Sequence, residues 1–222
     1  MLRAKISASM MCADIGRLNE TLDAFAEAGV DYLHIDVMDG AFAPNIMLGT
    51  DYVKQLRRLT EIPLDIHLMV ERPEDKIAWF EPRPGDIVSV HYESTPHAHR
   101  ALCKVRETGA KPMIAYNPAS DFSGVEYLLD VADAVLVMTV NPGYAGQALI
   151  KSTLSKINCL RERLDASDYG HIEIEVDGNV SFVNAKRMRE AGANIFVAGS
   201  SSVFTPGLSL RDAINKLSYS IN

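Results

Sequence analysis

The chain has 222 residues, of which 47% are hydrophobic and 23% are charged, and its formal net charge is −7. This length and apolar content suffice for one well-packed domain. The acidic balance and the lack of a long Lys and Arg run argue against nucleic acid as the main partner, because a phosphate backbone requires clustered cations. A small phosphorylated ligand is still compatible with an acidic chain if backbone N–H groups at helix N-termini bind it.

The N-terminal segment and the cysteines predict a cytoplasmic protein without a membrane anchor. The opening residues MLRAKISASMM are too short and too interrupted for a signal peptide. No stretch approaches the ~18 apolar residues of a membrane span. Cys12, Cys103 and Cys159 are widely spaced and form no C-x-x-C pair, so neither a disulfide framework nor a zinc knuckle is expected.

Short apolar runs of strand character alternate with stretches of helical spacing along the chain. The expected strands are Ala4–Ser9, Tyr32–Met38, Leu64–Val70, Ile87–His91, Met113–Tyr116, Ala134–Met138, Ile172–Val176 and Ile195–Ala198. The expected helices are Ile15–Glu27, Tyr52–Leu59, Glu74–Phe80, Ala98–Thr108, Val125–Asp130, Thr153–Leu164, Phe182–Glu190 and Leu210–Tyr219. Nearly continuous apolar strands are typical of a parallel sheet covered by helices. Eight successive units without a break favour a closed barrel over an open doubly wound sheet. The sequence therefore predicts one α/β domain over residues 1–222, a single (β/α)₈ TIM barrel.

Polar side chains gather where the expected strands end, which is where such barrels carry their active residues. His34 and Asp36 lie two apart on the second strand and so share a face, while His67 ends the third strand and Asp177 the seventh. Each alone has an ordinary role as a core histidine or a helix cap. Together they would be costly to bury unpaired, and a divalent cation such as Zn²⁺, Fe²⁺, Mn²⁺ or Co²⁺ removes that cost. From the residues alone, a metal site and a hydrogen-bonded polar core both stay open.

Glycine-bearing turns follow the last three expected strands, at Asn141–Gln147, Asp177–Asn179 and Gly199–Ser201. Glycine lets the backbone approach an anion closely, and the helix N-termini that follow supply N–H groups. Turns need glycine in any case. Three such turns at successive late strands nevertheless predict a phosphate site, which this fold often has in that place.

The chain resembles the ribulose-phosphate 3-epimerase family almost from end to end. The resemblance rests on the blocks SASMMCAD, HIDVMDGAFAPN, PLDIHLMV, VMTVNPGYAGQ, IEVDG and VAGSS, in this order and spacing. It implies the TIM barrel and an isomerase that inverts C3 of a ketose phosphate through a cis-enediolate. It also implies a homo-oligomer, either a dimer or a hexamer.

The resemblance assigns roles to individual residues. One divalent metal ion, with Zn²⁺ expected first, is implied at His34, Asp36, His67 and Asp177. The two carboxylates, Asp36 and Asp177, are implied as the acid/base pair. Further contacts with the phosphorylated substrate are implied for Ser9, Met38, Met69, Met138, Gly143, Gly146, Gly178, Asn179, Gly199 and Ser200.

Four positions depart from the common pattern of the family. The family usually has Pro where Ala8 stands, Ser where Cys12 stands, and Gly where Ala145 and Asn179 stand. The D-allulose-6-phosphate 3-epimerases are similar to this chain at the last three positions. A hexulose phosphate carries its phosphate one carbon farther from C3, and an added methyl and amide in the phosphate loops suit such a change. The sequence therefore slightly favours D-allulose 6-phosphate over D-ribulose 5-phosphate as the substrate.

Other functions also occur on a barrel of this size. A Schiff-base aldolase needs a lysine at the carboxyl end of a strand, whereas Lys5 and Lys111 lie early in their strands. A decarboxylase of the orotidine-phosphate type needs a lysine between the acids of the second strand, and the segment 36–39 has none. A non-catalytic sugar-phosphate-binding barrel is the alternative from another class. It would be expected to lack one of the four polar residues, and all four are present.

Overall fold

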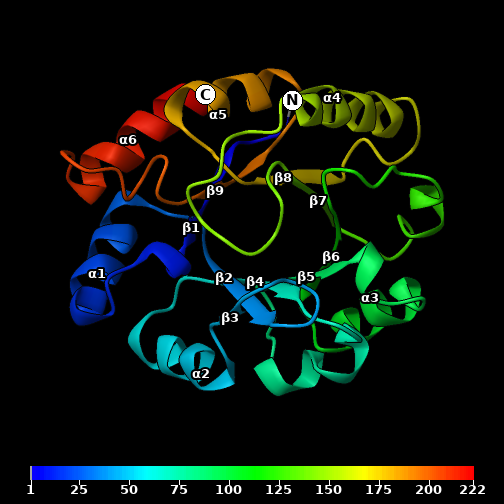
Figure 1. Cartoon of the computed structure of the whole chain (residues 1–222), viewed down its shortest axis with the longest axis horizontal. Helices are drawn as coiled ribbons and strands as arrows, with labels where there is room; N and C mark the ends of the chain where they lie inside the picture. Colours follow the sequence, from blue (N-terminus) through cyan, green and yellow to red (C-terminus); the bar gives the residue numbers. More distant parts are fainter. Residues whose placement is uncertain (1) are drawn as a thin grey trace.

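The structure is a computed structural model that describes residues 2–222. Eight parallel strands close into a barrel that helices surround (Figure 1). The strands are β1 Lys5–Ser9, β2 Tyr32–Asp39, β4 Leu64–Met69, β5 Ile87–His91, β6 Lys111–Tyr116, β7 Ala134–Met138, β8 Glu173–Asp177 and β9 Ile195–Ala198. Strand β1 pairs in parallel with both β2 and β9, which closes the ring. The predicted single-domain (β/α)₈ barrel is confirmed.

The barrel is covered by α-helices whose buried residues face the strands. These helices are α1 Leu18–Ala28, α2 Thr50–Leu59, α3 Ala98–Glu107, α4 Ser152–Asp165, α5 Phe182–Glu190 and α6 Leu210–Ile221. In α3, for example, Ala98, Ala101, Leu102 and Val105 are buried, at the spacing of one helical face. Within residues 2–222, no helix has the length and apolar content that crossing a membrane requires.

Two expected helices are not α-helices, and this part of the prediction is wrong. The segment 74–80 is divided between the 3₁₀ helices η3 (Pro73–Asp75) and η4 (Ile77–Phe80), and the segment 125–130 holds only the 3₁₀ helix η6 (Val125–Tyr127). In η4 the buried residues Ile77 and Phe80 are three apart. That spacing fits the three residues per turn of a 3₁₀ helix as well as it fits an α-helix. The apolar pattern alone therefore does not separate the two.

The chain after β2 contains a strand that the sequence did not predict. The two residues of β3, Ile46–Met47, pair antiparallel with the end of β2, where Met38 faces Met47. A two-residue strand has no periodicity to detect. Further 3₁₀ turns, η1 Met10–Cys12, η2 Ile15–Arg17 and η5 Tyr92–Ser94, lie next to strands or helices. The expected helix at 15–27 therefore begins as a 3₁₀ turn and becomes α-helical at Leu18.

The barrel interior contains an apolar cluster and a set of buried polar side chains. The apolar cluster comprises Tyr32, Ile87, Met113, Ala115, Ala134, Leu136, Met138 and Ile195. The buried polar side chains of β1, β2, β4 and β8 include Ser7, His34, Asp65 and Glu175. The outward side chains Ile35 and Val37 of β2 pack in the larger core beneath the helices. Alternation along β2 thus directs apolar groups to the helices and polar groups to the barrel axis.

Candidate active site

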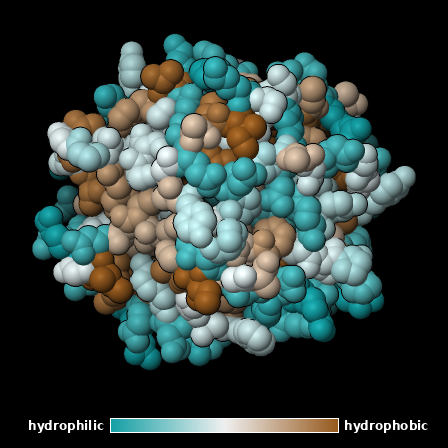
Figure 2. Space-filling view, in the orientation of Figure 1, coloured by the Kyte–Doolittle hydropathy of each residue, from teal (hydrophilic) through white to brown (hydrophobic). Residues whose placement is uncertain are grey.

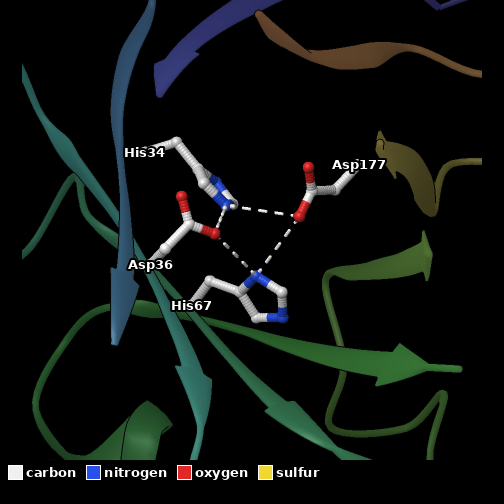
Figure 3. Close-up of side chains that lie close together, drawn as sticks. All are labelled: His34, Asp36, His67 and Asp177. Atoms are coloured by element: carbon white, nitrogen blue, oxygen red, sulfur yellow. Dashed lines mark ion pairs between the residues drawn. The ribbon is translucent and has the colours of Figure 1, made fainter. Parts of the chain in front are cut away.

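Four polar side chains converge at the carboxyl ends of three strands (Figure 3). His34 and Asp36 come from β2, His67 from β4 and Asp177 from β8. The Nε2 atom of His34 lies 3.3 Å from Oδ1 of Asp36 and 3.8 Å from Oδ2 of Asp177. The Nδ1 atom of His67 lies 3.7 Å and 3.6 Å from the same two oxygens. One potential ligand atom from each residue lies within 4.8 Å of the other three.

The nitrogen atoms that face this point have no other partner. His34 Nε2 and His67 Nδ1 are buried without a hydrogen bond. Although burial lowers it, the nearby carboxylates raise the pKa of His34 well above its ordinary value. Although burial raises it, the imidazole of His34 holds the pKa of Asp36 well below its ordinary value. The cluster therefore attracts positive charge, and two imidazoles with two carboxylates are a donor set that suits a divalent ion.

A second layer of buried polar groups lies beneath the four residues. Asp65 Oδ2 lies 2.7 Å from His34 Nδ1 and accepts a hydrogen bond of 2.7 Å from the hydroxyl of Ser7. Glu175 Oε1 lies 3.6 Å from the same nitrogen. Burial, together with Asp65, raises the pKa of Glu175 well above its usual range. This layer orients His34 with Nδ1 toward Asp65 and Nε2 toward the site.

This layer was not predicted, although the sequence contains a signal for it. Ser7, Asp65 and Glu175 each lie two residues before a predicted site residue on the same strand. Side chains two apart on a strand point the same way. The alternation that placed His34 with Asp36 therefore also places these three inside the barrel.

His91 at the end of β5 is a further residue that the sequence analysis missed. Its ring is fully buried and lies edge to edge with that of His67, with centroids 5.0 Å apart and planes at 22°. The Nε2 atoms of the two rings are 2.8 Å apart. Burial lowers the pKa of His91 to about 4, so this ring is neutral near pH 7.

A pocket opens above Asp36 and Asp177, and the expected substrate contacts line it. The hydroxyl of Ser9 donates to Asp36 Oδ2 at 3.0 Å. The thioethers of Met38, Met69, Met138 and also Met11, which was not predicted, line this pocket. Thioethers exclude water and offer no exchangeable proton beside the carboxylates.

The three predicted phosphate loops meet on the other side of the pocket. Gly143, Gly146, Gly178, Asn179, Gly199 and Ser200 all line it. Gly178 has φ 117°, and a Cβ atom there would lie 2.8 Å from the backbone nitrogen of Val140. Only glycine fits this close approach of two loops.

The side-chain amide of Asn179, a predicted substrate contact, has hydrogen-bond partners within the protein. Its backbone is left-handed, with φ 48°. Its amide nitrogen donates to the carbonyl of Gln147 at 2.7 Å, and its amide oxygen accepts from Asn184 at 2.7 Å. The side chain therefore connects the loop after β7 to the loop after β8, because both of its polar atoms have partners within the protein.

The loop after β7 extends across the barrel mouth, as the yellow-green segment of Figure 1 shows. Asn45, in the loop after β2, donates to the carbonyl of Gly143 at 2.9 Å, and the hydroxyl of Tyr144 donates to the carbonyl of Pro44. Seen down the same axis, this face mixes hydrophilic and hydrophobic side chains (Figure 2). The loop after β7, which lines the pocket, is thus held by hydrogen bonds to the loop after β2.

Comparison with known proteins decides the family. The model of the ribulose-phosphate 3 epimerase family matches residues 5–204. The chain belongs to this family. It is 45% identical over 198 residues to the chloroplastic ribulose-5-phosphate-3-epimerase of Arabidopsis thaliana, covering 88% of this chain and 70% of that protein. It is 43% identical to the ribulose-phosphate 3-epimerase of Synechocystis, covering 90% of this chain and 88% of the relative. The protein is therefore an isomerase of the epimerase type.

Solved structures of more distant proteins share the barrel. KGPDC from Streptococcus mutans superposes with a TM-score of 0.72 at 12% identity, covering 99% of this chain and 98% of that one. A 3-hexulose-6-phosphate synthase superposes with a TM-score of 0.65 at 14% identity over the whole of both chains. At such identities the likeness shows the fold alone. Lys5 and Lys111 occupy the first positions of β1 and β6, at the opposite end of the barrel from the pocket.

Proposed function

We propose that this member of the family interconverts D-ribulose 5-phosphate and D-xylulose 5-phosphate. The observation that carries the proposal is the pair Asp36 and Asp177, which come from β2 and β8 and face one point. Inversion at C3 removes a proton from one face of the substrate and returns a proton to the other. Two acid/base groups on different sides of the barrel meet that requirement.

The surroundings of the two carboxylates suit this proton transfer. Asp36 is the group that accepts the C3 proton in this proposal, and the adjacent imidazole of His34 favours its ionised form. The hydroxyl of Ser9 holds Asp36 in place. The negative charge left on the substrate is delocalised onto the C2 oxygen as a cis-enediolate, and Asp177 returns a proton to the other face. In the reverse reaction the roles of the two carboxyl groups exchange.

The residues of the site fit a divalent ion, which we propose as the cofactor. His34, Asp36, His67 and Asp177 would hold it, with Zn²⁺ first among the candidates and Fe²⁺, Mn²⁺ and Co²⁺ also compatible. When bound, the ion supplies a Lewis acid that stabilises negative charge on the substrate oxygens. The unpaired atoms His34 Nε2 and His67 Nδ1 support this assignment.

The substrate length is a separate part of the proposal. The sequence slightly favours D-allulose 6-phosphate, partly because Asn179 adds a donor to a phosphate loop. Its amide is bonded to Gln147 and Asn184, which weakens that reason. The Arabidopsis and Synechocystis relatives are both named for ribulose phosphate. We therefore place D-ribulose 5-phosphate first and keep D-allulose 6-phosphate as the second candidate, since Cys12 and Ala145 also line the pocket.

A comparison of kcat/KM for the two sugars, with the purified metal-loaded protein, tests this order. We expect D-ribulose 5-phosphate to be the better substrate, by roughly 10- to 100-fold if a misplaced phosphate contact sets the difference. A higher kcat/KM for D-allulose 6-phosphate would reverse the assignment. The double variant Asn179→Gly with Ala145→Gly then shows whether these two positions set the ratio.

A further inference from the structure

The two histidines of the proposed metal site are held by different partners. His34 Nδ1 meets the carboxylate of Asp65 directly, at 2.7 Å. His67 instead has Nε2 at 2.8 Å from Nε2 of another imidazole, His91. At this distance one of the two nitrogens donates a hydrogen and the other accepts it. Which one donates decides where His67 carries its proton, and therefore whether His67 Nδ1 has a free lone pair.

The far side of His91 fixes the direction of this hydrogen bond. His91 Nδ1 lies 3.2 Å from Oε2 of Glu93. The other oxygen of Glu93 accepts from the backbone nitrogen of Asn117 at 2.8 Å and from the hydroxyl of Ser120. Asn117 and Ser120 both donate to Glu93, which is the pattern around an ionised carboxylate that only accepts. His91 Nδ1 is therefore the donor to Glu93.

A neutral imidazole has only one N–H group, so the other nitrogen of His91 must accept. His91 is fully buried between the ring of His67 and that of Phe42, whose centroid is 4.6 Å away. Burying an imidazolium between two rings would be costly. With its hydrogen on Nδ1, His91 accepts through Nε2 from Nε2–H of His67. His67 Nδ1 then carries the lone pair, and it is the atom that lies 3.7 Å from Asp36 and 3.6 Å from Asp177.

We propose that His91 and Glu93 are positioning residues, which fix His67 in the tautomer protonated on Nε2 and present its Nδ1 lone pair to the divalent ion. The step to the ion rests on the proposed function, whereas the tautomer of His91 does not. Hydrogen-bond partners behind a ligating imidazole set its orientation and basicity, and their loss typically lowers metal affinity by about 10- to 100-fold. Here the carboxylate acts on the ligand through a second histidine.

The tautomer of His91 is measured by ¹⁵N–¹H correlation NMR of the imidazoles, with the zinc-loaded protein and again after chelation. We expect the His91 proton on Nδ1 in both samples, and the His67 proton on Nε2 in the zinc-loaded one. A His91 proton on Nε2 would overturn the proposal. This experiment uses the unaltered chain, so it does not depend on whether a variant folds.

The variant Glu93→Gln tests the consequence for the metal. Asn117 and Ser120 keep the amide oxygen as their acceptor, so the amide nitrogen turns toward His91 and donates to Nδ1. That reverses both hydrogen bonds and places a proton on His67 Nδ1. We expect the affinity for zinc, measured by competition with a chelator, to fall by about 10- to 100-fold, and the His91 proton to move to Nε2.

A matched control separates this effect from a general loss of charge. Glu126 is exposed on η6, 4.0 Å from Arg163, and Glu126→Gln should leave zinc affinity and the His91 tautomer unchanged. Zinc affinity of Glu93→Gln equal to that of the control would overturn the proposal. If neither the unaltered chain nor the control binds zinc, the proposed metal site fails instead, and the His91 tautomer still reports on the hydrogen-bond chain.

Discussion

Single side chains decide what this barrel does chemically, and Asp36 and Asp177 are the two on which the account depends most. Each is both a potential metal ligand and a proton carrier. Asp36 is buried beside His34 and His67, and it accepts a hydrogen bond from the hydroxyl of Ser9. Asp177 is less buried and faces the pocket. The two carboxyl groups therefore differ in their neighbours and in their exposure to the pocket.

Replacement of either carboxylate by an amide should abolish most of the epimerase activity. Asp36→Asn and Asp177→Asn keep the shape of the side chain but remove its capacity to carry a proton, so we expect kcat to fall by at least about 10²-fold. Metal content must be measured in the same samples. Asp23→Asn, on the exposed face of α1, serves as the control. A variant that retains most of its turnover would show that its residue is not an acid/base group.

At this scale, the sequence predicted residues whose position follows from strand alternation. His34, Asp36, His67 and Asp177 meet as expected because their strands belong to one ring and their side chains face its interior. The role of Asn179 could not be predicted, because its partner Gln147 belongs to another loop whose path depends on the whole fold.

Among the loops that follow the strands, those after β2 and β4 are connected by Asp39. Its carboxylate accepts from the backbone nitrogens of Ala41 and Phe42 in the loop after β2. It also accepts from the backbone of Glu71 at 3.0 Å and from Lys76 Nζ at 2.9 Å, after β4. These donors, led by Lys76, outweigh the effect of burial and lower the pKa of Asp39 to about 2.

The depressed pKa of Asp39 predicts a stability that depends on pH. The pKa of Asp39 is about 2 in the folded protein and ~3.9 in the unfolded chain. The ionised carboxylate therefore stabilises the folded state fully at pH values above the unfolded pKa. This stabilisation disappears as the pH falls toward 2. Because the carboxylate keeps contact with water, we expect Asp39→Asn to lower the free energy of unfolding by about 1 kcal/mol at pH 6. Urea titrations of both proteins should show the difference shrinking below pH 4, and a difference that does not change with pH would contradict this explanation.

The close contact between the loops after β7 and β8 predicts a specific effect of one methyl group. In Gly178→Ala the new Cβ would meet the side chain of Val140 at 2.5 Å, whereas in Gly207→Ala, also at positive φ, nothing lies within 4 Å. We expect Gly178→Ala to raise KM for the sugar phosphate and to destabilise the fold by about 1–3 kcal/mol. Thermal unfolding and steady-state kinetics measure both, with Gly207→Ala as the control for backbone strain. Equal effects in the two variants would refute the loop contact as the cause.

At the same scale, the strands were easier to predict than the short helices. Buried parallel strands appear as apolar runs that end within a few residues of their observed bounds. The segments around Ile77 and Val125 show why helices are harder. Ile77 and Phe80 are buried three residues apart, and so are Val125 and Leu128, a spacing that an α-helix and a 3₁₀ helix share.

The molecule as a whole combines a common scaffold with one distinctive interior. Barrels at 12–14% identity superpose over nearly the entire chain, so the fold does not determine the reaction. The chemistry must lie in the site, and in this chain β1, β2, β4 and β8 contribute buried Ser, His, Asp and Glu side chains to the interior. The homo-oligomeric state stays a prediction that light scattering can test. The cytoplasmic location stays a prediction that cell fractionation can test.

A metal ion held by β2, β4 and β8 should stabilise the entire barrel, because its ligands come from three strands. An ion that binds only the folded state adds about 2.7 kcal/mol when its concentration is 100 times Kd. We therefore expect zinc to raise the midpoint of thermal unfolding, and exhaustive chelation to lower both that midpoint and the turnover. His67→Ala should abolish the shift, whereas His99→Ala, on the exposed surface of α3, should preserve it. Full activity after chelation would rule out a metal-dependent reaction.

The central claim, that this chain inverts C3 with two carboxyl groups, is tested most directly by following the C3 proton. D-Ribulose 5-phosphate is incubated in D₂O with the metal-loaded protein, and substrate and product are examined by NMR and mass spectrometry. We expect the product, D-xylulose 5-phosphate, to carry one deuterium at C3, because the carboxyl group that returns the proton exchanges with solvent. Product that keeps the original C3 proton, or a protein that binds the sugar phosphate without forming product or exchanging that proton, would contradict it.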